Sequence, residues 1–284
     1  MKLLRLSGFV AIAICLIALL VNLNGCMNSA FYYPTKTVYS TPDQIGISYE
    51  AVSFKSADGV ELAGWFMPAK DIANARQAKG TVIHFHGNAE NMTSHWQFVG
   101  WLTARGFNVF VFDYRGYGAS GGSPSPAGCF EDSNAAIDYV RSRPDVDPER
   151  LLAFGQSLGG NNAIAAVGAG NRAGIRALAE ESTFFSYPSI ANDKIPGVGL
   201  LVDDHYSAKN YIAAIAPIPL LIIHGTDDTV IPYAHATRLF AAASEPKQFI
   251  TVEGGGHIEA MMHKEGPYRD MLVKFFENAL DRAN

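Results

Sequence analysis

The chain contains 284 residues and carries a formal net charge of −5, with 27 acidic against 22 basic residues. A chain of this length can bury enough apolar surface for one large domain. It contains no run of basic side chains, so the sequence predicts no nucleic-acid partner. No internal repeat or low-complexity tract indicates a second folded unit.

The first residues have the pattern of an export signal. Lys2 and Arg5 precede an uncharged apolar stretch from Gly8 to Val21. This stretch is shorter than the roughly 20 residues that span a bilayer, and it fits the hydrophobic region of a signal peptide. We therefore expect residues 1–25 to be a signal peptide. An uncleaved N-terminal anchor is the alternative.

The segment after the apolar stretch is a candidate lipidation site. Leu23-Asn24-Gly25-Cys26 resembles a bacterial lipobox, in which the cysteine is lipidated and becomes the mature N-terminus. The resemblance implies a lipid-anchored tether over residues 26–45. Met27 stands where an aspartate signals inner-membrane retention in similar lipoproteins. We expect an exported, membrane-anchored protein that faces the periplasm or the cell exterior, with the outer membrane favoured.

Residues 46–284 have the pattern of an α/β domain. Short apolar runs alternate with helix-like segments, which predicts a mostly parallel, buried eight-stranded sheet with helices on both faces. The alternation stops over residues 183–211, and this apolar segment after the sixth strand predicts a short lid. The predicted strands are 47–55, 60–67, 80–86, 107–113, 150–156, 175–181, 218–224 and 247–252.

The third predicted strand ends in a loop that contains Gly87 and Asn88. Gly87 would let the backbone approach a substrate closely, and the backbone amide of Asn88 is a candidate donor to an oxyanion. His84 and His86 share a face of this strand, but no third ligand follows in a spacing that metallohydrolases use. We expect no metal.

Gly116-Tyr117-Gly118-Ala119-Ser120-Gly121 after the next strand is a literal G-x-G-x-x-G. A dinucleotide site needs a helix that begins on these glycines. Pro124 and Pro126 follow almost at once and prevent an immediate helix. The sequence therefore predicts no organic cofactor.

A G-x-S-x-G motif lies between an apolar strand and a helix-like segment. Ser157 is its serine, flanked by Gly155 and Gly159. This context makes the serine an exposed nucleophile on a sharp turn, where the glycines avoid collisions with neighbouring backbone. The amide of Leu158, directly after the serine, is the first candidate oxyanion donor.

A serine needs a base and an acid to become a nucleophile. Asp227 and Asp228 follow the seventh predicted strand, and His257 follows the eighth. The order serine, acid, histidine is the one expected of α/β-hydrolases and differs from those of chymotrypsin and subtilisin.

These segments together resemble the α/β-hydrolase superfamily, and specifically its serine-aminopeptidase-like branch. The resemblance also rests on His86-Gly87-Asn88-Ala89 and on Asp113-Tyr114-Arg115-Gly116-Tyr117-Gly118-Ala119-Ser120, and it covers about residues 45–283. The branch's acid motif, G-x-x-D-x-x-[V/I]-P, aligns with Gly225, Asp228, Ile231 and Pro232. It therefore favours Asp228 over Asp227.

The resemblance implies a serine hydrolase that acts on a small-molecule or lipid-like acyl ester or thioester, with Ser157, Asp228 and His257 as its triad. Relatives with these motifs also include peptidases, so an aminopeptidase-type amide hydrolase is the alternative. A catalytically silent surface lipoprotein is a further one.

Overall fold

The computed structural model describes residues 31–264 and 266–282. The expected signal peptide over residues 1–25 and the expected lipidation site at Cys26 lie outside them. Within the described residues, no helix is both long and apolar enough to cross a membrane.

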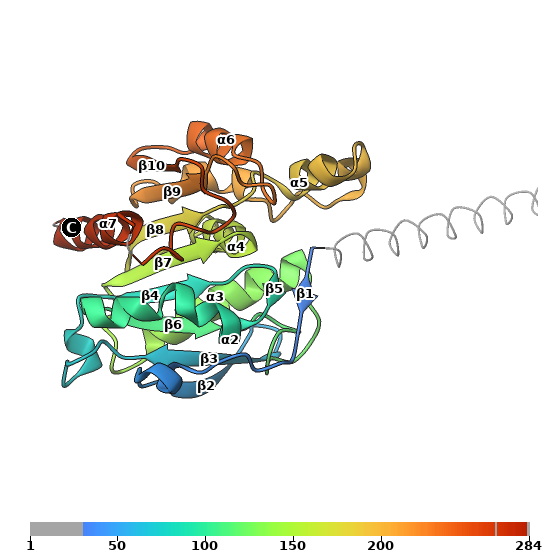
Figure 1. Ribbon diagram of the computed structural model, residues 1–284. Coiled ribbons are helices and arrows are strands. Elements are labelled where there is room, and N and C mark those ends of the chain that lie inside the picture. The colour runs from blue at the N-terminus through green and yellow to red at the C-terminus, as the bar shows by residue number, and fades with distance from the viewer. Residues whose placement is uncertain (1–30, 265, 283–284) are drawn as a thin grey trace, which may run out of the picture.

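The core of the molecule is one eight-stranded sheet with the order β10-β9-β8-β7-β4-β6-β3-β2 (Figure 1). Strands β10 to β6 in this order pair in parallel, whereas β3 pairs antiparallel with β6 and β2 antiparallel with β3. The predicted α/β-hydrolase fold with a mostly parallel sheet is therefore confirmed. The strands are β2 Glu50–Lys55, β3 Glu61–Met67, β4 Thr81–Phe85, β6 Asn108–Phe112, β7 Leu151–Gln156, β8 Ile175–Glu181, β9 Leu220–Gly225 and β10 Lys247–Val252.

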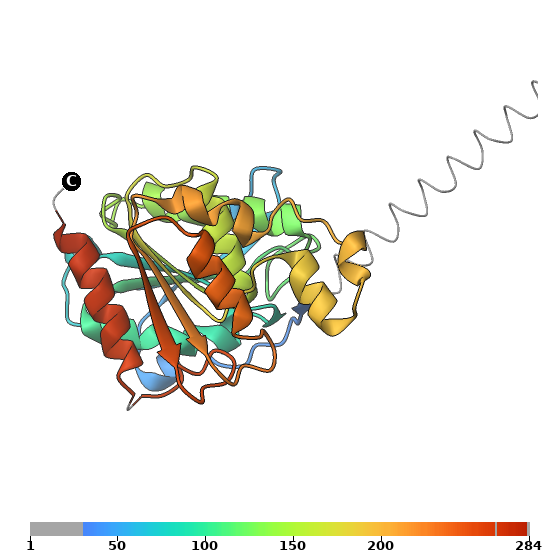
Figure 2. The ribbon, with the colours of Figure 1, turned by 90° about the horizontal axis from the view of Figure 1, so that it is seen from above.

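Helices cover both faces of this sheet (Figures 1 and 2). One hydrophobic cluster joins the sheet to α3, α4 and α6, and a second joins it to α7 and to the short helices between β5 and β6. The α-helices are α2 Met92–His95, α3 Pro126–Ser142, α4 Leu158–Gly168, α5 Tyr187–Lys194, α6 Ala234–Ala242 and α7 Tyr268–Asp281. The 3-10 helices are η1 Pro42–Ile45, η2 Ala75–Gln77, η3 Trp96–Phe98, η4 Gly100–Arg105, η5 Val198–Leu201, η6 Ala208–Asn210 and η7 Ile212–Ile215.

The central strands are apolar on both faces because both faces are covered. On β7, Leu151 and Ala153 belong to one cluster, whereas Leu152 and Phe154 belong to the other. Successive side chains of a strand point to opposite faces. An uninterrupted apolar run is therefore what a doubly covered parallel strand requires.

Two further features lie at the carboxyl edge of the sheet. Strand β1, Tyr33–Pro34, pairs in parallel with β5, Ala89–Glu90, and forms a small second sheet that the sequence did not predict. Between β8 and β9 the chain forms α5, η5 and η6, where a short lid was expected. These segments lie at the opposite end of the molecule from α7 in both ribbon views.

Candidate active site

Ser157 lies at the turn between β7 and α4. Its φ of 55° and ψ of −122° are in a sparsely populated region, which costs on the order of 1–3 kcal/mol and persists only where the surrounding structure enforces it. The amide of Ser157 donates to the Glu181 carbonyl at 2.9 Å. Its carbonyl accepts from the Gly160 amide at 3.0 Å and from the Thr183 hydroxyl. The serine is thus held from two neighbouring elements, and 7% of it remains exposed.

The two glycines of the motif are sterically required. A Cβ atom at Gly155 would overlap the backbone at the start of α4, and one at Gly159 would overlap the Phe85 carbonyl of β4. Gly87 is less constrained, because a Cβ atom there would lie 3.3 Å from the His95 ring and 3.7 Å from the Ser157 Cβ atom. The helix after the serine can therefore pack directly on the neighbouring strand.

Asp228 and His257 are hydrogen-bonded to each other. The distance from Asp228 Oδ2 to His257 Nδ1 is 2.7 Å, and Asp228 Oδ1 accepts from the amides of Val230 at 2.9 Å and Ile231 at 2.8 Å. Burial opposes ionisation of Asp228, but hydrogen bonds from histidines and backbone amides hold its pKa well below the ordinary value. Asp227 is exposed, and its carboxylate accepts from the Thr226 hydroxyl instead.

Glu181, at the end of β8, connects the serine to the histidine loop. Its carbonyl accepts from the Ser157 amide, and its buried carboxylate accepts from the Ala260 amide at 2.7 Å and the Gln156 side-chain amide at 2.7 Å. Gln156 in turn lies 3.0 Å from the Nε2 atom of His84. This buried polar chain, which sequence reasoning missed, joins three neighbouring strands beneath the serine.

His224, on β9, lies directly beside the acid. Its Nε2 atom is 2.8 Å from the Ile231 carbonyl oxygen and 3.4 Å from Asp228 Oδ2. Burial alone would lower the pKa of His224, yet Asp228 and the carboxyl group of Glu180 hold it above its ordinary value. Burial raises the pKa of Glu180 to about 8. In the sequence, Glu180 and Glu181 at the end of the apolar strand β8 could have indicated this cluster. Carboxyl groups are rarely buried, so two of them at the end of a buried strand suggest a polar network.

Asn88 is fixed in place by the N-terminal segment. Its carbonyl accepts from the Tyr33 amide at 2.9 Å and the Tyr117 hydroxyl at 2.8 Å, and its side-chain amide donates to the Phe31 carbonyl at 3.3 Å. Leu158 is the first residue of α4. Amides in the first turn of a helix lack acceptors within that helix. Both residues border the same pocket as Ser157.

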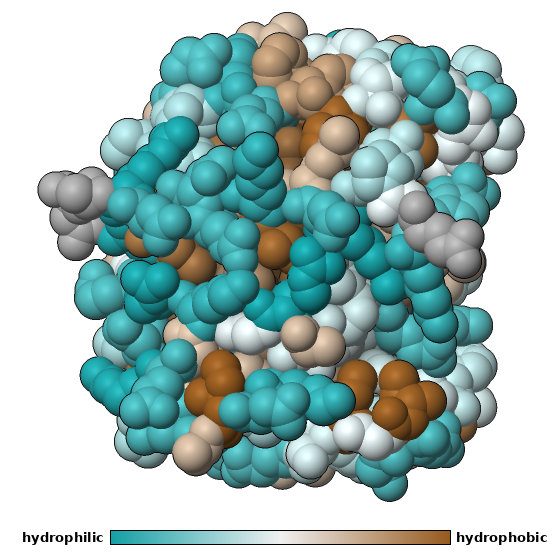
Figure 3. Space-filling view, turned by 60° about the vertical axis from the view of Figure 1, so that its left-hand side comes forward, coloured by the Kyte–Doolittle hydropathy of each residue, from teal (hydrophilic) through white to brown (hydrophobic). Residues whose placement is uncertain are grey.

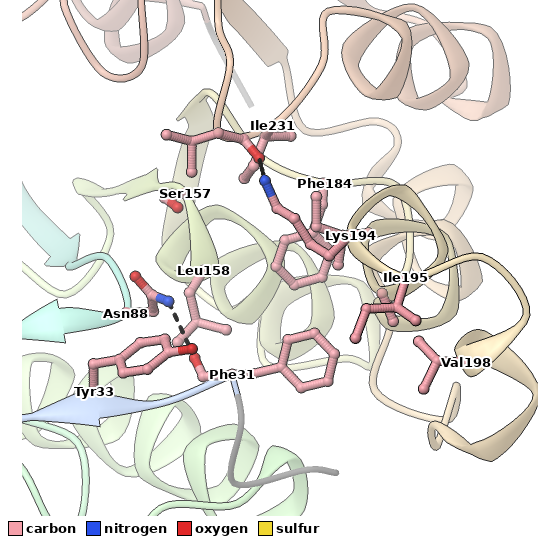
Figure 4. A pocket seen from close by; sticks show the side chains of 13 residues that line it. Phe31, Tyr33, Asn88, Ser157, Leu158, Phe184, Lys194, Ile195, Val198 and Ile231 are labelled. Atoms are coloured by element: carbon pink, nitrogen blue, oxygen red, sulfur yellow. Dashed lines mark hydrogen bonds between the residues drawn. The ribbon is translucent and has the colours of Figure 1, made fainter.

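This pocket has a volume of about 400 Å³. Figure 4 shows Ser157 and Asn88 at its inner side and the lid residues Ile195 and Val198 opposite them. Lys194 donates from Nζ to the Val230 carbonyl at 2.9 Å and carries the only charge among the described residues that line the pocket. The lining is Phe31, Tyr33, Asn88, Ser157, Leu158, Phe184, Ile190, Ala191, Lys194, Ile195, Val198, Val230 and Ile231.

The other candidate motifs have structural roles in the described residues. The segment from Gly116 to Gly121 is a loop, in which the Gly116 amide donates to the Gly121 carbonyl at 2.7 Å. Helix α3 begins only at Pro126. His86 follows β4 directly, and its Nε2 atom lies 3.5 Å from the Asp113 carboxylate.

The chain is similar to one protein-family model and to full-length proteins of other organisms. A protein-family model described as "Serine aminopeptidase, S33" matches residues 76–203. The uncharacterized protein YfhR of Escherichia coli (strain K12) is 50% identical over 255 residues, which cover 89% of this chain and 88% of that protein. The alpha/beta hydrolase domain-containing protein WAV2 of Arabidopsis thaliana is 32% identical over 295 residues, which cover 95% of this chain and 92% of that protein.

A solved structure supports the same fold. An esterase of Pyrococcus furiosus superposes with a TM-score of 0.70 at 19% identity, over 87% of this chain and 98% of the esterase. At this level of identity the similarity concerns the fold alone.

Proposed function

Because this chain belongs to the α/β-hydrolase family, we propose that it is a serine hydrolase that cleaves acyl esters or thioesters through an acyl-enzyme. One observation carries the proposal: a backbone-strained serine borders an apolar pocket at the sheet edge where Asp228 is hydrogen-bonded to His257. The polar chain through Glu181 supports it, because it connects the histidine loop to the serine.

The proposed mechanism has two halves. The Ser157 Oγ atom attacks the acyl carbonyl carbon while His257 takes the hydroxyl proton, and His257 then gives that proton to the departing alcohol or thiol. Water next attacks the acyl-enzyme with His257 as base, which releases the acid and the free serine. The Asp228 carboxylate accepts a hydrogen bond from Nδ1 of His257, which fixes its tautomer and stabilises the imidazolium.

The backbone amides of Leu158 and Asn88 are the proposed oxyanion donors. Both residues border the pocket beside Ser157. Donors held in place before the reaction lower the barrier because they need not reorganise as the negative charge develops on the oxygen. No metal or organic cofactor takes part in this mechanism.

The pocket lining favours an acyl substrate over an aminopeptidase substrate. An aminopeptidase needs a negative group to receive the substrate's α-ammonium, and the lining in the described part of the chain has no carboxylate. Its apolar wall suits a hydrocarbon chain. The family model's name keeps amide hydrolysis as the second candidate function.

We also propose that the protein acts at a membrane outside the cytoplasm. Support comes from the sequence of the first residues, where an apolar stretch leads to Cys26. Cleavage behind Gly25 and diacylation of Cys26 would provide the two-chain anchor that stable attachment requires.

An activity-based probe tests the nucleophile. We expect a fluorophosphonate to label the wild-type protein and to leave Ser157→Ala unlabelled, because only an activated serine attacks phosphorus.

His257→Ala should remain folded and lose on the order of 10⁴ or more in kcat. The hydrolysis rate of the wild-type protein should then be measured with esters, thioesters and aminoacyl amides as substrates. Equal labelling of Ser157→Ala would exclude Ser157, and a preference for aminoacyl amides would favour the peptidase.

A further inference from the structure

Large apolar side chains are exposed around the mouth of the pocket. We call Tyr33, Ile195, Leu200, Leu201 and Val230 the mouth rim. Tyr33, Ile195 and Val230 line the pocket, and Leu200 and Leu201 belong to η5, whose first residue also lines it. Leu200 is 92% exposed and Ile195 61%. Scattered exposed apolar residues are ordinary, but several of them around one pocket indicate an interaction surface.

The chain enters the described structure at this same place. Phe31, the first described residue, lines the pocket, and Tyr33 follows it in β1. The apolar stretch ends at Val21, so at most about 35 Å of extended chain separates it from Phe31, and about 18 Å separates Cys26 from Phe31. Either form of N-terminal attachment would therefore hold the mouth rim close to the bilayer.

The two charged side chains next to Ile195 each have a hydrogen-bonding partner. Lys194 is engaged with the Val230 carbonyl, and Asp193 lies 2.5 Å from Nε2 of His235. The α7 end of the molecule has a different character. The face that Figure 3 brings forward is mostly hydrophilic, with only scattered apolar residues. Both ribbon views place α7 and the lid at opposite ends.

We infer that the mouth rim docks on the lipid bilayer, so that the pocket opens toward the hydrocarbon region and takes its acyl substrate from the membrane. This inference rests on the proposed function for the substrate's chemistry and on the proposed attachment for the distance. It adds an orientation: the lid end faces the membrane and the α7 end faces water. Side chains such as Leu200 would enter the interface as apolar anchors.

The inference is tested with the full-length protein in dioleoylphosphatidylcholine vesicles, with or without brominated acyl chains. A polarity-sensitive fluorophore is attached at Leu200→Cys or Ile195→Cys, and at Met271→Cys on α7 as the matched control. Met271 is also exposed, at 45%. Cys129 is buried, and the parent protein without an added cysteine gives the background labelling. We expect a blue-shifted emission that brominated lipid quenches at both rim positions and an unchanged emission at Met271→Cys.

This measurement does not depend on catalysis, so it separates failure of the docking inference from failure of the proposed activity. Rim probes that remain in a watery environment would overturn docking. Equal quenching at Met271→Cys would also overturn it, because it would mean unspecific adsorption. A blue shift that depends on protein concentration and is insensitive to bromine would assign the rim to a second copy of the chain and overturn lipid docking.

A hydrolysis assay gives a second test. Leu200→Asp should lower turnover of a long-chain ester carried in vesicles by about tenfold or more, because burying one leucine is worth about that factor. Turnover of a soluble short-chain ester should stay unchanged. An equal loss on both esters would indicate damage to the pocket and contradict the inference.

Discussion

Glu180 places an acid with a raised pKa next to the elbow of the serine. It is fully buried on β8, and its carboxyl accepts from the Thr183 amide at 3.0 Å. Burial raises its pKa from an ordinary 4.5 to about 8. Between these two values the folded protein keeps a proton that the unfolded chain releases, so the free energy of unfolding falls as pH rises.

We therefore expect the free energy of unfolding to fall less steeply between pH 5 and pH 8 in Glu180→Gln than in the wild type. Each pH unit in this window removes up to about 1.4 kcal/mol in the wild type through this residue. Urea unfolding at several pH values measures the difference. The exposed Glu149→Gln is the control and should follow the wild type. Parallel curves for wild type and Glu180→Gln would show that Glu180 is ionised in the folded protein.

Substitution of the two neighbouring aspartates should have different effects on activity. Asp228→Asn should lower kcat by on the order of 10⁴, because an amide at this position favours the wrong tautomer of His257. Asp227→Asn should retain nearly full activity, since its carboxylate is exposed and accepts from the Thr226 hydroxyl. Steady-state hydrolysis by both purified variants decides the question. A large loss of kcat in Asp227→Asn and none in Asp228→Asn would identify Asp227 as the acid of the triad.

At the scale of elements, β1 controls the loop that carries Asn88. The Tyr33 amide donates to the Asn88 carbonyl, while the Tyr33 side chain lines the pocket. Tyr33→Pro removes both the donor and the side chain, whereas Tyr33→Ala removes only the side chain. We expect Tyr33→Pro to have a kcat about tenfold or more below that of Tyr33→Ala, because a displaced donor stabilises the developing oxyanion less well.

The KM values of these two variants should remain close to each other. Kinetics on a soluble ester, with thermal melting as a check of folding, provide the measurement. An identical kcat in the two variants would mean that the β1 hydrogen bond has no influence on the oxyanion loop.

Elements with an internal pattern were predictable from the sequence, whereas those defined by a distant partner were not. All eight strands of the sheet were predicted close to their observed bounds. For the central strands the reason is that a strand covered on both faces is a continuous apolar run. Strand β1 has only two residues, both exposed, and exists through its pairing with β5. Likewise, Ser157, Asp228 and His257 stand in recognisable motifs, but the chain from His84 through Gln156 to Glu181 joins three strands that sequence does not bring together.

At the scale of the whole molecule, the N-terminal attachment makes a prediction that is independent of catalysis. Cys26→Ser should abolish metabolic labelling with a fatty-acid analogue and leave the precursor unprocessed, because the sulfur that would carry the lipid is lost. Cys129→Ala should keep the label, since Cys129 is buried in the domain. Mass spectrometry of the mature N-terminus is the direct measurement. A peptide that begins at Met1 would favour the uncleaved anchor.

The sequence separation of the site residues determines when the protein can first react. Phe31 and Asn88 come from the first third of the chain, Ser157 from the middle, and His257 follows β10, the last strand of the sheet. A chain synthesised or transported only through β9 and its following loop contains the proposed nucleophile and the proposed acid but lacks His257, the proposed base. Under the proposed mechanism, such a partial chain cannot activate its serine. Hydrolysis would therefore begin only after β10 and the loop that follows it have joined the sheet, and acyl compounds that the growing chain meets earlier would not be cleaved.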